Sequence, residues 1–362
     1  MSWSISIGSI SGIRIRIHMT FLLFLIWIGV SFWQEGGASA AVNGLAYILL
    51  LFLCVVMHEF GHILTARRFG SETQDVILLP IGGVARMKSI PEKPGQELAV
   101  ALAGPAVNLM IALILVALIG WQSIVESIAH PMAEARIFSL LAVANLFLAL
   151  FNLLPAFPMD GGRALRALLS YGQGRAKATN LAMRVGHTLA LGLGAFGFLY
   201  GLPLLILIAV FIYFGATTEN QSTQLHQLAR RMTVSDAMIT QFSTLPVDSR
   251  VSDAVEVLIH SSQHDIPIVD GLGRMMGLLT RSQILHALHD KGDQVPVSDV
   301  MQGNIPSLDE RSCLEDALRL IDEEQVPAVS IADTHGRMVG MVTLENLGQM
   351  MVLERQRPNA IT

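Results

Sequence analysis

Long apolar runs dominate the first 218 or so residues of the chain and are separated by short polar segments. Six of them approach the ~20 residues that a helix needs to cross the hydrocarbon core of a bilayer. After this region the apolar content falls to that of an ordinary soluble domain. The pattern predicts a polytopic α-helical membrane protein with a soluble C-terminal part. The predicted spans are about 19–34, 41–66, 97–121, 137–157, 185–200 and 202–217.

Two shorter segments have the alternation of β-strands instead. The sequence "GIRIRIHM" (12–19) alternates isoleucine with arginine or histidine, which gives a strand one polar face. The sequence "DVILLPIGGVARM" (75–87) reads as a strand that is interrupted at Gly82 and Gly83. We therefore expect a small β-sheet at the membrane edge, where protein or water covers its backbone.

Basic residues lie on alternate sides of the predicted spans. Arg14 and Arg16 precede the first span, and two further basic clusters follow the second and fourth spans, whereas the intervening loops near 35–40, 122–135 and 200–202 contain no Lys or Arg, with Arg136 at the border of the second. Cytoplasmic loops of membrane proteins are enriched in these residues. The segments predicted to face the cytoplasm are the N terminus, 67–96, 158–184 and everything after 218.

Composition narrows the function classes. Apolar residues make up 52% of the 362 residues and charged residues 15%, which fits a chain largely in lipid. The net charge of −5 provides no basic footprint and there is no nucleic-acid motif, so we expect no nucleic-acid partner. Cys54 and Cys313 are too few for a disulfide framework or a four-cysteine metal site. The first apolar run lacks a small-residue cleavage site and is followed by more spans, so it is not a cleavable signal peptide.

The second apolar run contains polar side chains where lipid would make them costly. His58 and His62 are four residues apart, so on a helix they share one face and can reach a single metal ion. Glu59 follows the first histidine and can lean toward a water on that metal. Ionisable residues within a span mark function by default. The H-E-x-x-H pattern therefore predicts a zinc metalloprotease site, against the alternative of three hydrogen-bonded structural side chains.

A catalytic zinc usually takes three protein ligands, so a third side chain is needed. Asp160 is the best candidate, in "FNLLPAFPMDGGRALRALL" at the end of the fourth span. Pro155 and Pro158 break the helix there, and two glycines after Asp160 free the backbone. The alternative role for Asp160 is the N-cap of the helix that follows. The other ligand candidates are His18, Glu72, Asp75, Glu97 and His187.

Three motifs in this order resemble the site-2 protease family of intramembrane zinc metalloproteases: H-E-F-G-H, "AGPAVN" (103–108) and "NLLPAFPMDGG" (152–162). The resemblance covers roughly residues 5–215. It implies that His58, His62 and Asp160 bind zinc and that Glu59 is the general base. It also implies that Asn152 lies near the active site, where the alternative is a polar residue hydrogen-bonded between helices. Met159 stands where leucine is common in the family.

The family chemistry implies a mechanism and a kind of substrate. Zinc acidifies a water, Glu59 takes its proton and later protonates the leaving amine, and Asn152 helps zinc to stabilise the oxyanion. The implied substrate is a membrane-anchored protein that is cut within or near its span. Gly104, Pro105 and Asn108 are expected to shape close helix packing.

Residues 233–352 contain an internal repeat, which indicates a duplicated unit. "VSDAM" at 234 returns as "VSDVM" at 297, and "GRMMGLLT" at 273 returns as "GRMVGMVT" at 336, both at an offset of 63 residues (297 − 234 and 336 − 273). Each copy reads as strand, helix, strand, strand, helix. The repeat resembles a pair of CBS domains, which implies a cytosolic α+β module that binds adenine nucleotides such as ATP, ADP or AMP, and a homodimer formed through it.

The candidate nucleotide contacts are Thr280, Asp270, Thr343 and Asp333. The sequence departs from the family's G-x-x-T-x-x-D pattern, because Gln283 and Asn346 replace the two aspartates. An amide lacks the charge that strengthens a hydrogen bond to a ribose hydroxyl, so we expect weak binding or binding at one site. The alternative is a module that only dimerises or holds substrate.

The predicted domains follow from these boundaries. They are a transmembrane metalloprotease domain (1–218), a connector (219–232), a first CBS domain (233–292) and a second (293–355). Two other functions stay open on the sequence: a CBS-regulated transporter or channel, in which the histidines line a pathway, and a catalytically inactive scaffold with the protease fold.

Overall fold

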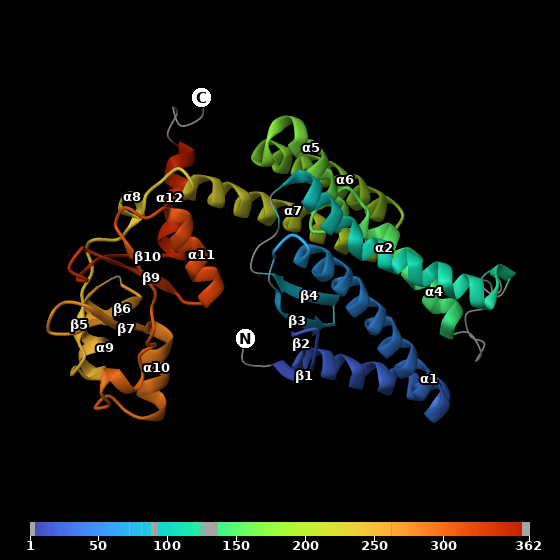
Figure 1. Ribbon diagram of the computed structural model, residues 1–362. Coiled ribbons are helices and arrows are strands. Elements are labelled where there is room, and N and C mark those ends of the chain that lie inside the picture. Colours follow the sequence, from blue (N-terminus) through green and yellow to red (C-terminus); the bar gives the residue numbers. More distant parts are fainter. Residues whose placement is uncertain are drawn as a thin grey trace. The chain divides into compact units, whose positions relative to one another are not determined.

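The computed structural model describes residues 4–71, 73–80, 82–87, 91, 93–122, 125, 137–261 and 263–356. The chain forms two compact units, Met1–Gln221 and Ser222–Thr362. The first unit combines apolar helices with one small sheet (Figure 1). Its elements are β1 (Ser4–Ile10), β2 (Ile13–His18), α1 (Met19–Arg67), β3 (Thr73–Leu79), β4 (Gly82–Met87), α2 (Pro94–Ile119), α4 (Ile137–Asn152), α5 (Asp160–Gln173), α6 (Arg175–Leu199) and the larger part of α7 (Pro203–Ala229), whose last residues belong to the second unit.

Helix α1 is a hairpin of two helical segments. Its 49 residues would extend more than twice the ~30 Å of a bilayer core at 1.5 Å per residue. The helix breaks at Gly36 and Gly37, and Gly37 has a φ of 69°, which glycine adopts without strain. Phe21 and Phe52 pack with ring centres 4.4 Å apart, so the two segments fold back on each other. The predicted spans 19–34 and 41–66 are the two arms of this hairpin.

The prediction of apolar helices is confirmed, whereas the count of six spans stays a prediction. Among the described residues, α1, α2, α6 and α7 are long and apolar enough to cross a membrane, and α4 is a shorter apolar helix. Two helices are longer than predicted: α6 begins at Arg175 instead of 185, and α7 ends at Ala229 instead of 217. In both cases the helix continues through polar residues that contain no proline to stop it.

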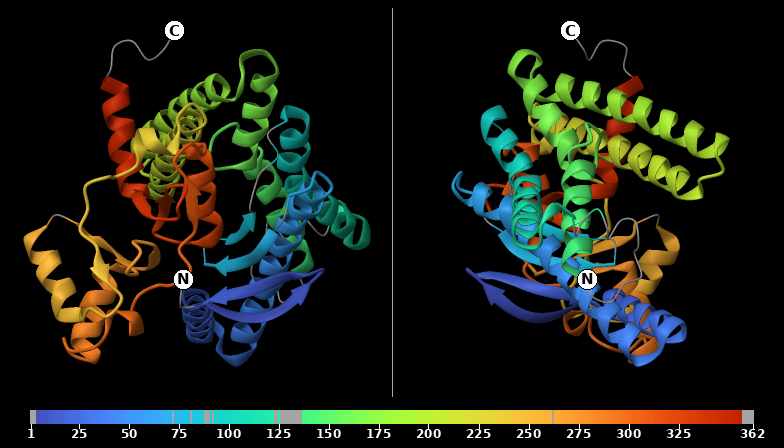
Figure 2. Two further views of the ribbon diagram at one scale, coloured as in Figure 1. Left: turned by 60° about the vertical axis from the view of Figure 1, so that its left-hand side comes forward. Right: turned by 90° about the vertical axis from the view of Figure 1, so that its right-hand side faces the viewer.

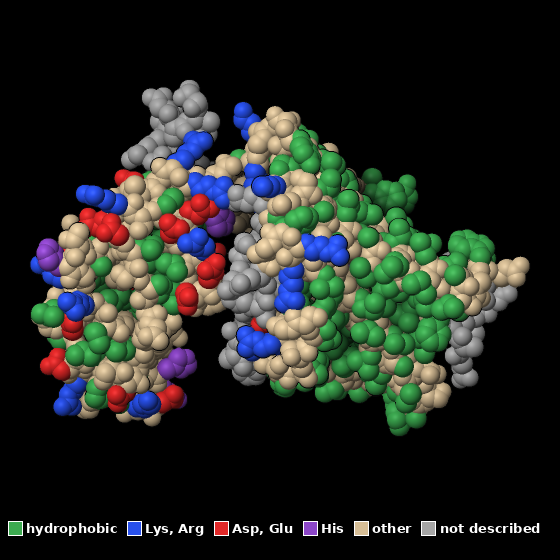
Figure 3. Space-filling model, in the orientation of Figure 1, with side chains coloured by type: hydrophobic (Ala, Val, Ile, Leu, Met, Phe, Trp, Pro, Cys, Tyr) green, Lys and Arg blue, Asp and Glu red, His purple; other side chains and the backbone are tan. Residues whose placement is uncertain are grey.

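The surface of the first unit suits a lipid environment. Hydrophobic side chains cover most of the face of its helices that Figure 3 shows. Leu118 is 76% exposed and Phe198 is 79% exposed, and many other large apolar side chains are also exposed. Such a large apolar surface would drive association in water, but it matches hydrocarbon.

The four strands of the first unit form one sheet in the order β1-β2-β3-β4. Strands β2 and β3 pair in parallel, and the other neighbours are antiparallel. The sheet lies beside α1 (Figures 1 and 2), where Ile13 and Val76 pack on Ile63. The strand predicted at 12–19 is confirmed as β2, whereas the run at 75–87 is two antiparallel strands, β3 and β4, and not one interrupted strand. Strand β4 forms one edge of the sheet.

Helices α1 and α2 approach each other closely at a glycine. A Cβ atom on Gly61 would lie 2.8 Å from the carbonyl oxygen of Ala103 and 2.9 Å from Cγ2 of Val107. Small residues allow such close approach of helix backbones in membranes. The face of α1 that carries His58 and His62 therefore lies directly against α2.

A tight turn at residues 153–159 connects α4 to α5. A Cβ on Gly161 would lie 2.3 Å from the carbonyl oxygen of Leu153, and one on Gly162 would lie 2.5 Å from the backbone nitrogen of Phe157. The turn packs under the first residues of α5 because these positions have no side chain. This packing fixes the start of α5, which is Asp160.

The second unit contains two copies of the predicted strand–helix–strand–strand–helix pattern, each with a three-stranded sheet. Its elements are α8 (Val234–Ala237), β5 (Leu245–Pro246), α9 (Val251–His260), β6 (Asp265–Val269), β7 (Met275–Thr280), α10 (Arg281–Asp290), η1 (Val297–Asp299), β8 (Ser307–Asp309), α11 (Leu314–Glu324), β9 (Ala328–Ala332), β10 (Met338–Thr343) and α12 (Leu344–Gln356).

The two copies exchange their leading segments. Val234 and Ala237, at the start of the first copy, lie in the apolar core of the second copy with Leu314. Val297, at the start of the second copy, lies in the core of the first copy with Ile266. The predicted domain boundaries at 233, 292 and 355 describe the sequence repeat and stay a prediction. The apolar core of each copy also includes residues from the range assigned to the other copy.

The contact at Gly61 generates a prediction about stability. Gly61→Ala should lower the free energy of unfolding by about 1–3 kcal/mol, because the added methyl group overlaps the backbone of α2. The measurement is the thermal unfolding midpoint of the protein in detergent. Gly192→Ala in α6 is the matched control, since a Cβ there meets no atom within 4 Å. Equal midpoints for the two variants would contradict the packing.

Candidate metal centre

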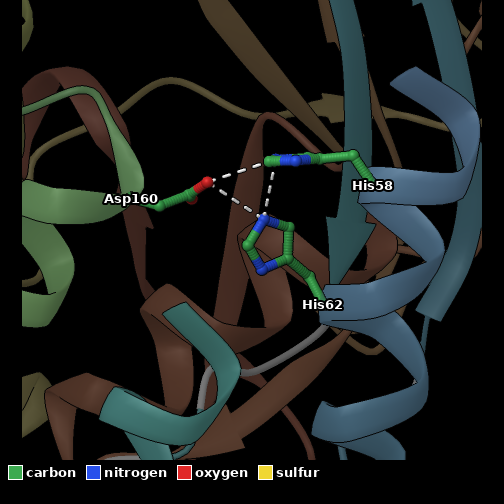
Figure 4. Close-up of side chains that lie close together, drawn as sticks. All are labelled: His58, His62 and Asp160. Carbon is green, nitrogen blue, oxygen red and sulfur yellow. Dashed lines mark hydrogen bonds and ion pairs between the residues drawn. The ribbon is translucent and has the colours of Figure 1, made fainter. Parts of the chain in front are cut away.

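Two distant segments contribute to one cluster of buried side chains. His58 and His62 lie one turn apart on the second arm of α1, and Asp160 is the first residue of α5. All three are buried, at 6%, 4% and 8% exposure. Figure 4 shows the two imidazole rings and the carboxylate pointing toward one another. The histidine spacing brings two ligands to one face, and the turn at 153–159 delivers the third.

The three candidate ligand atoms of the cluster are separated by nearly equal distances. Oδ2 of Asp160 is 3.2 Å from Nε2 of His58 and 3.1 Å from Nε2 of His62, and the two nitrogens are 3.1 Å apart. A tetrahedral zinc with ligands at about 2.0–2.1 Å holds neighbouring ligand atoms about 3.3 Å apart. The three atoms therefore have nearly the spacing of three corners of a zinc site, and the donor set of two histidines and a carboxylate is one that zinc takes.

The hydrogen bond of His62 to the backbone orients its ring for a cation at the centre. Nδ1 of His62 donates a hydrogen bond to the carbonyl oxygen of Val100 at 2.7 Å, because a carbonyl can only accept. When the ring is neutral, Nε2 therefore carries the lone pair that can bind a cation, and it faces a carboxylate oxygen and a second imidazole nitrogen. A proton on Nε2 of His62 could form a good hydrogen bond to only one of these two neighbours. A cation between the three atoms could bind all of them. Such a backbone bond is also the usual way that a metal-binding histidine is oriented.

Gly104 makes room for the two imidazoles. A Cβ on this residue of α2 would lie 2.2 Å from Nε2 of His62 and 2.7 Å from Nε2 of His58. The backbone of α2 therefore forms one wall of the cluster, at the point where any side chain would enter it. The sequence predicted close packing at Gly104, and the structure shows that the packing partners are the candidate ligands themselves.

Glu59 lies between the histidines along α1 and is half-buried. A Cβ on Gly83 of β4 would lie 2.9 Å from Cγ of Glu59. The backbone of the edge strand therefore packs directly against this side chain. Glu59 is placed beside the cluster without being one of its three converging groups.

The other ligand candidates are engaged elsewhere in the described part of the chain. Asp75 pairs with Arg16 across β2 and β3 at 3.3 Å, and Glu97 pairs with Arg166. His18 caps the N terminus of α1, and His187 hydrogen-bonds to Thr217 at 3.0 Å. Glu72 lies outside the described residues.

Asp160 is not the N-cap of α5. The N-cap is Met159, and no side chain donates or accepts a capping hydrogen bond there. The alternative role for Asp160 is therefore wrong, and its carboxylate points to the histidines instead. Asn152 is the last residue of α4 and is half-buried, so its role near the active site stays a prediction.

Sequence reasoning missed several groups that shape the cluster. Val100 acts through its backbone carbonyl, for which a sequence has no signal. Gly83 was noted only as an interruption of a strand. Arg166 belongs to the basic cluster that follows the fourth predicted span, which predicts only orientation, yet its side chain is 1% exposed. The one available signal was its place between Leu165 and Ala167 in an otherwise apolar stretch.

The two amides of the second unit have local partners. Oε1 of Gln283 accepts hydrogen bonds from the backbone nitrogen and the hydroxyl of Thr280, at 2.8 and 3.0 Å. Nδ2 of Asn346 donates to the carbonyl of Ala237, and its backbone nitrogen donates to the hydroxyl of Thr343 at 3.1 Å. The amides thus cap α10 and hold the exchanged segment.

Asp270 and Asp333 occupy equivalent hairpin turns between paired strands. Oδ1 of Asp270 accepts from the backbone nitrogens of Leu272 and Arg274, and Oδ1 of Asp333 accepts from the corresponding nitrogens two and four residues further on. The backbone hydrogen bond from Arg337 is the main cause that lowers the pKa of the Asp333 carboxyl. The structure gives both carboxylates a role in the turns, and nucleotide contact stays a prediction.

Comparison with known proteins places the chain in a family. Peptidase family M50 matches residues 46–135 and 121–193, and the CBS domain matches residues 234–290 and 297–348. Zinc metalloprotease MJ0392 of Methanocaldococcus jannaschii is 35% identical over 280 residues, which cover 77% of this chain and 78% of the relative. Stage IV sporulation protein FB of Bacillus subtilis is 26% identical over 275 residues, covering 74% of this chain and 92% of the relative.

Among solved structures, the site-2 protease from Methanocaldococcus jannaschii is 38% identical, with a TM-score of 0.44. The match covers 60% of this chain and 95% of that one. The sequence matches alone show the family, since a relative above 30% identity covers most of both chains. The chain therefore belongs to peptidase family M50, the site-2 protease family of membrane-embedded zinc metalloproteases, and carries two CBS domains.

Proposed function

We propose that this protein is an intramembrane zinc metalloprotease that cleaves membrane-anchored proteins within or near their spans. The observation that carries the proposal is the convergence of His58, His62 and Asp160 on one point, with Glu59 beside them. This arrangement supports a catalyst over a scaffold, because buried groups in an apolar unit are costly unless they serve a site.

The residues have separate tasks in the proposed reaction. His58, His62 and Asp160 would hold zinc, and the bound ion would supply Lewis-acid chemistry to an attacking water and to the scissile carbonyl. Glu59 takes the proton of the attacking water and returns a proton to the leaving amine. Asn152 donates to the oxyanion that develops on the substrate.

The edge strand β4 suits the binding of an unwound substrate. Its outer edge has no neighbouring strand among the described residues, and Gly83 packs against Glu59. An extended peptide can add to such an edge through main-chain hydrogen bonds. We propose that β4 and the neighbouring part of the site face the cytoplasm, as do the N terminus and the CBS pair. The basic residues of the chain lie in these same segments, and cytoplasmic segments are enriched in them.

The CBS pair is the proposed point of regulation. It would bind an adenine nucleotide weakly, at one or both copies, and would also provide a homodimer contact. The local bonds of Gln283 to Thr280 support weak binding, since the threonine hydroxyl is already engaged.

The first test removes the base and the ligands one at a time. Glu59→Gln should retain zinc and lose cleavage by about 10²–10⁴-fold, because only the proton acceptor is lost. His58→Ala, His62→Ala and Asp160→Ala should each lose zinc as well. The measurements are zinc content by elemental analysis and comparative proteomics of membrane fragments, with the active and the Glu59→Gln protein.

A matched control for this test is His187→Ala. This histidine lies on α6 and bonds to Thr217, outside the cluster, so its loss should leave the zinc content unchanged. Full zinc in Asp160→Ala would remove that residue from the ligand set and point to another carboxylate. Zinc with no difference in membrane fragments would favour the inactive scaffold.

The second test concerns unwinding of the substrate. A substrate span with Gly or Pro near the cut should be cleaved faster than an all-leucine span, because an edge strand binds only extended backbone. The measurement is the initial rate on two model substrates that differ only in these residues, with the Glu59→Gln protein as the blank. Equal rates would show that unwinding does not limit cleavage.

The third test restores the missing charges of the CBS pair. Gln283→Asp and Asn346→Asp should bind ATP, ADP or AMP more tightly than the unmodified protein, because charge-assisted hydrogen bonds are roughly twice as strong as neutral ones. Calorimetry of the whole protein in detergent gives the affinities. No heat at millimolar nucleotide with any of the three proteins would leave the module as a dimerisation or docking element.

A further inference from the structure

A buried ion cluster lies close to the candidate metal centre and is not part of it. Arg166 on α5 is 1% exposed. Its guanidinium contacts Glu97 of α2, with Nε 2.7 Å and Nη2 2.5 Å from Oε1, and its Nη1 contacts Glu219 of α7. Glu97 is 2% exposed, and the Glu219 side chain is 32% exposed. Arg166 therefore connects three helices, α5, α2 and α7, through its two ion pairs.

The Glu97 end of the cluster leads to the histidines through α2. Val100, whose carbonyl holds Nδ1 of His62, lies three residues after Glu97, and Gly104 lies seven residues after it. These spacings are about one and two helical turns, so the three positions lie along one side of α2. A shift of Glu97 along or around α2 would therefore move both the hydrogen-bond acceptor of His62 and the wall behind the imidazoles.

The Arg166 end of the cluster leads to Asp160. Arg166 lies six residues after Asp160 in the same helix, which is about 9 Å along the axis. The guanidinium carbon also lies 5.1 Å from the ring centre of Phe157, in the turn that precedes Asp160. Arg166 is therefore connected to Asp160 in two ways, through the backbone of α5 and through its contact with the preceding turn.

These contacts form a continuous path between two of the candidate ligands. One path runs from Asp160 through α5 to Arg166, across to Glu97, and along α2 to the acceptor of His62. A buried ion pair is weak evidence for stability, since apolar replacements are often as stable. A planar guanidinium that binds two carboxylates does fix orientation, and a lysine cannot reproduce that geometry.

We infer that Arg166 is a positioning residue for the metal centre: it holds Asp160 at the distance from the two histidines that a single ion requires, by binding Glu97 and Glu219 together. This inference rests on the proposed zinc site and adds the element that sets its geometry. Because Glu219 of α7 binds Arg166, the position of α7 also influences where Asp160 lies.

The test measures zinc affinity of the full-length protein in detergent, by competition of Zn²⁺ with a chelator of known affinity. Arg166→Lys and Glu97→Gln should each weaken zinc binding by about 10–100-fold, as loss of groups that orient ligands does. Glu219→Ala, at the half-exposed partner, should weaken it by roughly tenfold. The visible spectrum of the Co²⁺-loaded protein should shift in the same variants, because it reports the geometry of the ligands.

Arg16→Lys is the matched control. It alters an arginine–carboxylate pair of the same unit, with Asp75, which connects β2 and β3. A folded Arg166→Lys protein with unchanged zinc affinity and an unchanged Co²⁺ spectrum would overturn the inference, even if its unfolding midpoint fell. If Arg166→Lys and Glu97→Gln do not fold, unchanged affinity in Glu219→Ala overturns it. Failure of the unmodified protein to bind zinc would instead overturn the metal centre itself.

Discussion

Three electron-pair donors held within 3.2 Å of one another, away from water, form the constraint on which the rest of the first unit depends. A proton or a cation shared among these atoms stabilises them at such short distances, and the segments around them must fix where they meet. The hydrogen bond from His62 to Val100 fixes one ring, and the missing side chain at Gly104 admits both rings. The close approach of α1 and α2 at Gly61 follows from the same need, because neither contact survives if the two helices move apart.

Charge in an apolar unit is distributed in two layers. The inner layer is the histidine and aspartate cluster, and the outer layer is Arg166 with its two carboxylates. The outer layer has opposite charges in direct contact, which lowers the cost of burying them. The inner layer pairs one carboxylate with two imidazoles, which carry a positive charge only when they are protonated. This difference explains why the outer layer can act as a rigid support while the inner layer remains available for chemistry.

Much of this arrangement could be predicted from the sequence, and the exceptions have a common cause. The H-E-x-x-H spacing specifies one face of a helix, and the prolines and glycines around Asp160 specify a break, so both parts of the cluster were predicted. The strands were predicted from alternation. What was missed depends on contacts between segments far apart in the chain, such as the carbonyl of Val100, the backbone of Gly83 and the burial of Arg166. The lengths of α6 and α7 were underestimated because hydropathy marks only the part of a helix that lies in lipid. Both helices continue into polar sequence beyond that part.

The exchange of leading segments in the second unit has a consequence for how such a module can change over evolutionary time. Each copy completes its apolar core with residues that precede the other copy, as Val234 and Val297 do. Loss of one copy by a deletion would remove residues from the apolar core of the other copy, so the copy that remained would be less stable. A single cut of the chain between the copies would leave two fragments that still interlock.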